Sequence, residues 1–257
     1  MNTLVRITLD ILVVSIAIAG GFYQIYLKPL LYTLGYSPTR IIELRGNQDC
    51  KTIPELKACE SPQFYFFPLR VLSSKKNWHV RLLEIVLHQS TGVIYLACST
   101  LHSRSHWIPA IGSLNATGAS NEDYVATYDP ATSQVSRLST PDFNNGRGLS
   151  LHGMDVVPSS SDPQELFIYL VNHRIPLGDR SAEKIGADSV IEIFKTTVGG
   201  TALTHIKTVE DPIIFTPNDL VGSADGKSFY FTNDNDAKVG IVSYPIHCIT
   251  SLLRDEP

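Results

Sequence analysis

Three short apolar strands recur along the chain after residue 80, and this repeat constrains the fold more than any other feature. The strands begin at about Glu84, Gly153 and Asp219, a period of roughly 65 to 70 residues. Each is followed by a turn and an aromatic-rich strand: VIYLACS, LFIYLVNH and SFYFTND. The first two units continue into a further hairpin with a Pro- or Gly-containing turn. The pattern predicts an all-β fold made of repeated, mostly four-stranded units.

A β-propeller satisfies this pattern, because its blades are four-stranded sheets repeated about a central channel. The period is longer than the roughly 40 to 50 residues of simple propeller repeats, and loop insertions account for the difference. In such a fold the first residues of every innermost strand meet at one mouth of the channel. A β-sandwich of similar strands is the alternative.

The N-terminus forms a separate element. Residues 7–26 (ITLDILVVSIAIAGGFYQIY) are almost all apolar and match the roughly 20 residues that a helix needs to cross a bilayer. We interpret residues 1–30 as a signal anchor or transmembrane helix, 31–45 as a linker and 46–257 as the β-rich body. A cleaved signal peptide and a buried helix are the alternatives. Positive charges flank the segment on both sides and predict no orientation.

Composition narrows the partners and the compartment. The formal net charge of −4 and the lack of a long basic run argue against a nucleic-acid partner. Cys50 and Cys59 bracket a short polar segment and can close a disulfide loop, whereas Cys98, on an apolar strand, is expected to be a core thiol. A glycosylation sequon starts at Asn115. With the apolar N-terminus, these features favour a membrane-anchored protein of the secretory pathway, with its body in the endoplasmic reticulum lumen or outside the cell.

Residues 61–83 (SPQFYFFPLRVLSSKKNWHVRLL) do not fit the repeat. They are aromatic and basic and follow neither strand nor helix periodicity. Removing them joins Glu60 directly to Glu84. We interpret the segment as an insertion, and a membrane-surface patch is the alternative.

Three polar pairs lie at the edges of predicted strands: His152-Gly153, Asn172-His173 and Asn218-Asp219. Two imidazoles can perform acid/base chemistry, because the ordinary pKa of histidine lies near neutral pH. A carboxamide and a carboxylate supply the oxygen ligands that hard cations prefer. If the strand ends converge, the chain can form a hydrolytic site. Taken singly, each pair is also an ordinary turn, strand cap or loop-to-strand junction.

The segments LHG, LVNH, SVIEIFK, PNDLVGS and FYFTND resemble those of the paraoxonase/arylesterase family in residue type, order and spacing. The resemblance runs from about Glu43 to Asp236 and is strongest from Leu151 to Asp234. It implies a six-bladed β-propeller, often with a retained N-terminal hydrophobic segment, that hydrolyses lactones and aryl esters with calcium. About three to four blades of such a propeller are visible in this chain.

The resemblance also implies roles for individual residues. His152 and His173 would form a histidine dyad in which one imidazole activates water and the other orients it. Two calcium ions are expected, one catalytic and one structural, held by hard oxygen ligands. Asn218 and Glu60 would ligate the catalytic ion. The structural ion would be held by Asp219, Glu84 and the carbonyl of Met154.

The chain departs from the family pattern after Asp236, where the tail VGIVSYPIHCITSLLRDEP has no recognisable counterpart. The family takes further calcium ligands from later blades, and none can be assigned here. A calcium site with fewer ligands binds more weakly. We therefore expect a calcium-dependent arylesterase or lactonase that is truncated and impaired.

Two alternative functions stay open at this point. One is a non-catalytic, membrane-tethered β-propeller fragment, and the other is a gluconolactonase-like hydrolase of sugar lactones. The expected partners are a small-molecule ester or lactone and a membrane, and the sequence predicts no oligomeric state.

Overall fold

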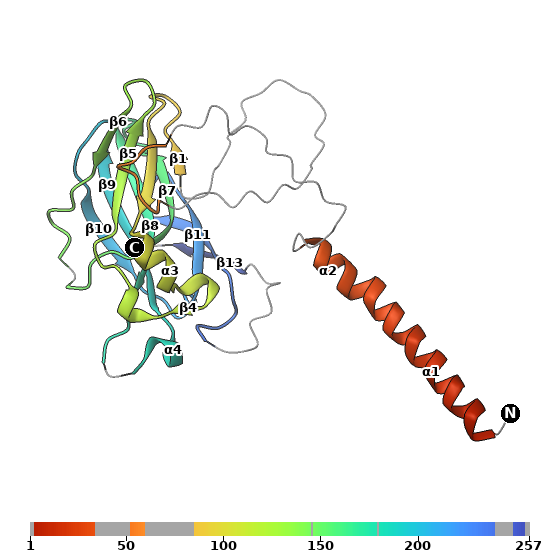
Figure 1. Ribbon diagram of the computed structural model, residues 1–257. Coiled ribbons are helices and arrows are strands. Elements are labelled where there is room, and N and C mark those ends of the chain that lie inside the picture. Colours follow the sequence, from red (N-terminus) through yellow and green to blue (C-terminus); the bar gives the residue numbers. More distant parts are fainter. Residues whose placement is uncertain are drawn as a thin grey trace. The chain divides into compact units, whose positions relative to one another are not determined.

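The computed structural model describes residues 3–33, 52–59, 85–144, 146–178, 180–239 and 249–254 (Figure 1). The chain divides into two compact units, Met1–Thr52 and Ile53–Pro257. The predicted insertion at residues 61–83 and the predicted linker after Thr33 lie outside the described residues.

The first unit is helical. Helix α1 (Thr3–Phe22) continues through a π-helical turn, η1 (Tyr23–Leu27), into α2 (Lys28–Thr33). The π turn lies just before Pro29, whose ring removes one amide donor and crowds the preceding turn, so a wider turn accommodates it. Val5–Tyr32 is long and apolar enough to cross a membrane, with a mean hydropathy of 1.9 in its most apolar window. A membrane span and a signal sequence both have this length and composition.

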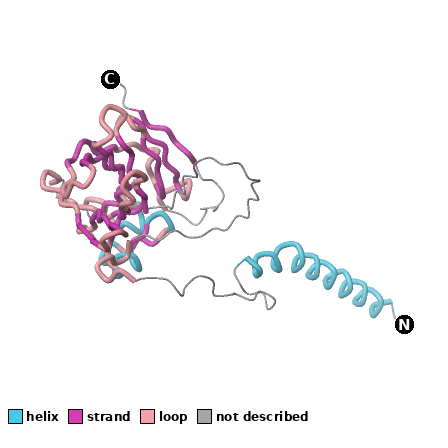
Figure 2. Tube along the Cα trace, turned by 90° about the horizontal axis from the view of Figure 1, so that it is seen from above, coloured by secondary structure: helices cyan, strands magenta, loops and turns pink. Residues whose placement is uncertain are grey.

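The second unit consists mainly of strands (Figure 2). They form antiparallel sheets, and in each of the three larger sheets the strands lie side by side in chain order. The first sheet contains β1 (Ile85–Leu87), β2 (Ile94–Cys98), β5 (Tyr124–Asp129) and β6 (Gln134–Arg137). The second contains β7 (Leu151–Pro158), β8 (Glu165–Arg174), β9 (Asp188–Thr197) and β10 (Thr204–Val209). The third contains β11 (Pro217–Gly222), β12 (Ser228–Asn233) and β13 (Ile249–Arg254). The strands predicted to start each repeat are the first strands of these sheets, β1, β7 and β11. The repeat is therefore confirmed at the level of three sheets.

Strand β13 was not expected from the sequence. It pairs with β12 along its whole length, from Ser228↔Arg254 to Asn233↔Ile249. The tail lacks the motifs of the other repeats, and only the backbone pairing reveals its strand.

The second sheet lies between the other two, and β8 shows how. Ile168 and Leu170 belong to a core cluster shared with the first sheet. Tyr169 and Val171, on the opposite face, belong to a cluster shared with the third sheet. Successive side chains of a strand point to opposite faces, so a strand covered on both sides is apolar throughout. This explains the continuous apolar run of β8, in which each buried side chain contributes about 1.5–3 kcal/mol.

The first two strands of the second sheet share an irregular end. Leu151 pairs with Asn172, whereas Met154 pairs with Leu170, so β7 holds one extra residue, a β-bulge. The fully buried Asn172 fixes this end, because its Oδ1 accepts a hydrogen bond from the Ser150 amide at 2.9 Å.

The third sheet repeats the same device. Pro217 pairs with Asn233 and Leu220 with Phe231, which again leaves one extra residue on the first strand. Asn233 is also fully buried, and its Oδ1 accepts a hydrogen bond from the Thr216 amide at 3.0 Å. Asn172 and Asn233 therefore hold equivalent positions, and so do the residues next to them.

The first sheet differs at this position. Cys98 follows the same spacing from the first strand and forms a disulfide with Cys59, across a sequence separation of 39. The expectation that Cys98 is an unpaired core thiol was therefore wrong, and so was the expected pairing of Cys59 with Cys50, which itself lies outside the described residues. Sequence spacing favoured the short loop, but strand β2 brings Cys98 to Cys59.

Five short elements between β2 and β5 form a segment that we call the cap, residues 101–119. It contains α3 (Leu101–His106), β3 (Trp107–Ile108), the 3-10 turn η3 (Pro109–Ile111), β4 (Ser113–Leu114) and the turn η4 (Ala116–Gly118). Trp107 packs against Ala182 in the short helix α4 (Ala182–Ile185) and against Ala187. The cap thus covers the end of the second sheet at which His173 lies (Figure 1).

Candidate functional site

The two predicted catalytic histidines lie side by side. Their ring centroids are 5.4 Å apart in an edge-to-face arrangement, and both residues are buried, with 4% exposure for His152 and 2% for His173. His152 lies in the bulge of β7, and His173 lies one residue after Asn172 on β8. The bulge turns His152 toward the neighbouring strand end, which explains why strand residues separated by 21 positions meet.

The equivalent positions of the third sheet carry Asn218 and Asp234. The Asn218 carboxamide Nδ2 donates a hydrogen bond to Asp234 Oδ1 at 3.0 Å. Asp234 stands where His173 stands in the second sheet, and Asn218 stands where His152 stands. Each bulge therefore presents one polar pair.

Gly153 brings the two pairs together. A Cβ atom at this position would overlap the Asn218 carbonyl oxygen and lie 2.7 Å from the Cα of Asp219. Only glycine permits this approach of β7 to β11. Because β7 meets β11 here, the polar pairs of the two sheets form one group of four side chains: His152, His173, Asn218 and Asp234.

Further hydrogen bonds hold the ring and the backbone of His173. Its Nδ1 lies 2.9 Å from Ser189 Oγ, its carbonyl accepts a bond from Trp107 Nε1 at 2.9 Å, and its amide bonds to the Ser150 carbonyl at 2.8 Å. Its Nε2 is buried and has no hydrogen-bond partner among the described residues. The Nδ1 atom is therefore anchored, and the Nε2 atom is available for a reaction.

Burial shifts the protonation of this group. It lowers the pKa of His173 well below its usual range, and the charges of His152 and Arg104 lower it further. Burial also raises the pKa of Asp234, against the opposing effects of His152 and of the hydrogen bond from Asn218. His173 is consequently neutral at neutral pH, and the Asp234 carboxylate lies where a nearby positive charge would stabilise it.

The predicted calcium ligands are placed only in part. Asn218 and Asp219 lie together at the start of β11, and the Asp219 amide is 3.4 Å from Thr232 Oγ1. The side chain of Met154 is buried in the core. Glu60 and Glu84 lie outside the described residues.

The oxygen atoms at this end of the third sheet are of the chemical type that calcium binds. Carboxamide and carboxylate oxygens from Asn218, Asp219 and Asp234 are the hard ligands that calcium takes, and the half-buried Asp234 carboxylate favours a cation. Calcium needs six to eight oxygens. In the part of the chain that the structure describes, no group of three or more His, Cys, Asp or Glu side chains is arranged to hold a metal ion.

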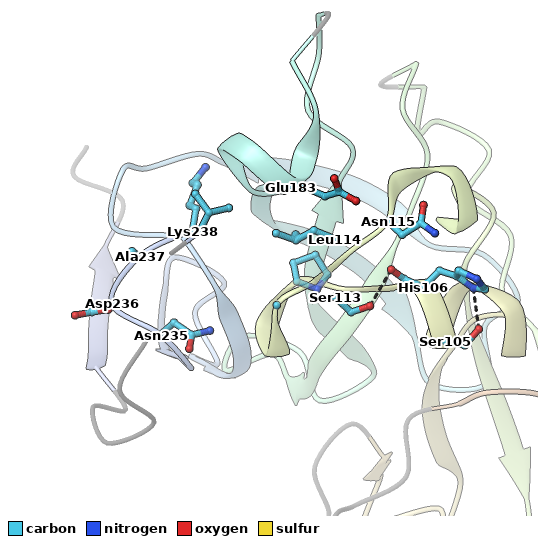
Figure 3. A pocket seen from close by; sticks show the side chains of 13 residues that line it. Ser105, His106, Ser113, Leu114, Asn115, Glu183, Asn235, Asp236, Ala237 and Lys238 are labelled. Carbon is cyan, nitrogen blue, oxygen red and sulfur yellow. Dashed lines mark hydrogen bonds between the residues drawn. The ribbon is translucent and has the colours of Figure 1, made fainter. Parts of the chain in front are cut away.

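A pocket of 770 Å³ lies between the cap, α4 and the residues after β12 (Figure 3). Polar side chains line it from the cap and α4 (His106, Asn115 and Glu183) and from the residues after β12 (Asp236 and Lys238). Asn235 is tied to the cap by a bond from its Nδ2 to the Ala110 carbonyl at 2.8 Å. Neither His152 nor His173 lines this pocket.

Three residues that form or support this site were not predicted from the sequence: Asp234, Ser189 and Trp107. The first had a usable signal, because LVNH and FTND end equivalent strands and place Asp234 opposite His173. Ser189 and Trp107 come from a neighbouring strand and from the cap, and no local pattern marks them.

Comparison with known proteins adds no identification. The chain matches no protein-family model and no curated protein.

Proposed function

We propose that this chain is a calcium-dependent hydrolase of aryl esters or lactones, built as part of a paraoxonase-like β-propeller. The observation that carries the proposal is the buried pair of His152 and His173 beside Asn218 and Asp234. Acid/base groups next to oxygen ligands for a hard cation are what ester hydrolysis by an activated water requires.

The two histidines differ in a way that assigns their roles. The lowered pKa of His173 makes it a weak base, and Ser189 fixes its ring. His152 would take the proton from the attacking water, and the buried Nε2 of His173 would orient that water.

Calcium would be held at the mouth formed by β11. Asn218, with Glu60, would ligate a catalytic ion, and Asp219, with Glu84 and the Met154 carbonyl, would ligate a structural ion. Bound there, calcium would polarise the ester carbonyl and stabilise developing negative charge.

The blade interpretation supports the proposal. Three antiparallel sheets are stacked face to face with their first strands adjacent, as neighbouring blades would be. Two of these sheets carry an equivalent bulge in the first strand. In such a propeller, the polar pairs would lie at one mouth of a central channel.

Hydrolysis of phenyl acetate and of a γ-lactone by the purified full chain tests the proposal. We expect turnover that EGTA abolishes and calcium restores, and a loss of about a hundredfold or more in kcat for His152→Gln. His88→Gln, which alters a buried histidine directly after β1, is the matched control and should retain activity. Absence of calcium-dependent turnover in a folded wild-type protein would refute the proposal.

One observation favours a second candidate, a non-catalytic, membrane-tethered β-protein. Both histidines are almost inaccessible, and the pocket beside the cap does not reach them. In that case His152→Gln would change stability only, and neither substrate would be hydrolysed with or without calcium.

A further inference from the structure

The cap carries an exposed turn at Asn115-Ala116-Thr117. Asn115 and Thr117 are both exposed, and Asn115 Oδ1 accepts hydrogen bonds from the Thr117 amide at 3.2 Å and from the Thr117 hydroxyl at 2.7 Å. These bonds leave the Asn115 Nδ2 atom out of the turn. The carboxamide and the hydroxyl two residues later are thus already in contact.

The backbone beneath this turn is tied down. The Asn115 amide bonds to the His106 carbonyl at 3.0 Å, and Ser113 Oγ donates to the same carbonyl at 2.9 Å. Gly118 is buried against the His106 ring, where a Cβ atom would clash. Because the inner side of the loop is fixed, the Asn115 and Thr117 side chains stay on the surface.

Asn115-Ala116-Thr117 is the only Asn-X-Ser/Thr triplet in the sequence. This triplet is the acceptor for N-linked glycans, which are bulky and need a surface position.

Two features outside the loop indicate the compartment in which this modification occurs. The apolar helix Val5–Tyr32 has the length of a membrane span or signal sequence. The Cys59–Cys98 disulfide is of the kind that persists in oxidising compartments.

We infer that Asn115 is N-glycosylated and that the unit from Ile53 onward is therefore translocated into the secretory lumen. The glycan donor is a lipid-linked oligosaccharide diphosphate. The bond between Asn115 Nδ2 and the first sugar forms as the sugar–phosphate bond breaks, Nδ2 loses one proton and the lipid diphosphate leaves. Since Asn115 also lines the 770 Å³ pocket, the glycan stands at the rim of that pocket (Figure 3).

Expression of the full chain in eukaryotic cells tests this inference. The wild-type chain should migrate more slowly on a denaturing gel and shift to the unmodified position after peptide-N-glycosidase treatment. Asn115→Gln and Thr117→Ala should lose the shift. Thr117→Ser, which keeps the hydroxyl, and Asn121→Gln, which alters a nearby asparagine outside the triplet, should retain it.

A wild-type chain that does not shift, or an Asn115→Gln chain that still does, overturns the inference. Neither result depends on hydrolytic activity.

Discussion

The second and third sheets share one backbone design and carry different chemistry on it. Each has a bulge at the start of its first strand and a buried asparagine, Asn172 or Asn233, at the end of its second. The bulged end of the second sheet presents two histidines, and that of the third presents a carboxamide and a carboxylate. A repeated fold thus delivers side chains to equivalent places, and the differences between repeats create the site. The contrast can be tested at each shared position.

The largest expected effect is on the unfolding free energy, and it should differ between the two buried asparagines. The Asn172 Nδ2 donates to Glu192 Oε1 at 3.1 Å, and Glu192 is fully buried. Asn172→Asp would place two carboxylates in contact and should cost about 3–5 kcal/mol of unfolding free energy. Asn233→Asp removes a donor to the Ile213 carbonyl and meets two amide donors, so about 2 kcal/mol is expected. Chemical denaturation measures both, and equal losses would contradict the contrast.

The first sheet offers a second test, because a disulfide stands where the other sheets have asparagine. Cys59→Ser should destabilise the second unit by about 3 kcal/mol, since the unfolded chain loses a crosslink. Thermal unfolding of the wild type with and without reductant should show the same loss, and the variant should not respond to reductant. A response in the variant would mean that another disulfide contributes.

Gly153 tests the contact between the sheets. Gly153→Ala must push β7 from β11 and should cost about 2 kcal/mol. The proposed hydrolytic activity should fall as well, because His152 moves away from Asn218. The control is Gly199→Ala, at a turn with φ of 75° and open space around it, where about 1 kcal/mol is expected from backbone strain alone. A milder effect at Gly153 than at Gly199 would exclude close packing there.

The smallest effect concerns pH. The folded pKa of His173 lies below the unfolded value of about 6.5, so the unfolded state binds more protons below that pH and stability falls as pH drops through it. The raised pKa of Asp234 acts in the opposite sense at lower pH, where protonation removes a half-buried charge.

His173→Gln should therefore flatten the stability profile between about pH 7 and 5, by at most about 1.4 kcal/mol per pH unit. Urea denaturation across this range measures it, with the exposed His102→Gln as control. An unchanged slope in His173→Gln would assign the pH dependence to other groups.

Much of the architecture could be predicted because its signals are local. The apolar run before Tyr32 and the period-two alternation of the strands depend on neighbours in sequence, and the starts of the three sheets followed from them. The pairing of Cys59 with Cys98 and the strand β13 could not be predicted, since both depend on which strands become neighbours.

The sequence by itself determined an apolar helix, a β-rich body in repeated units and the identity of the polar pairs at the strand starts. Each of these features depends on residues that are close together in the chain. Only the tertiary structure decided that His152 and His173 are in contact, that Asp234 rather than another carboxylate joins Asn218, and that Trp107 of the cap holds the His173 backbone. The physical reason is the close approach of β7 and β11 at Gly153, which depends on the packing of the two sheets and is marked in the sequence by a single glycine.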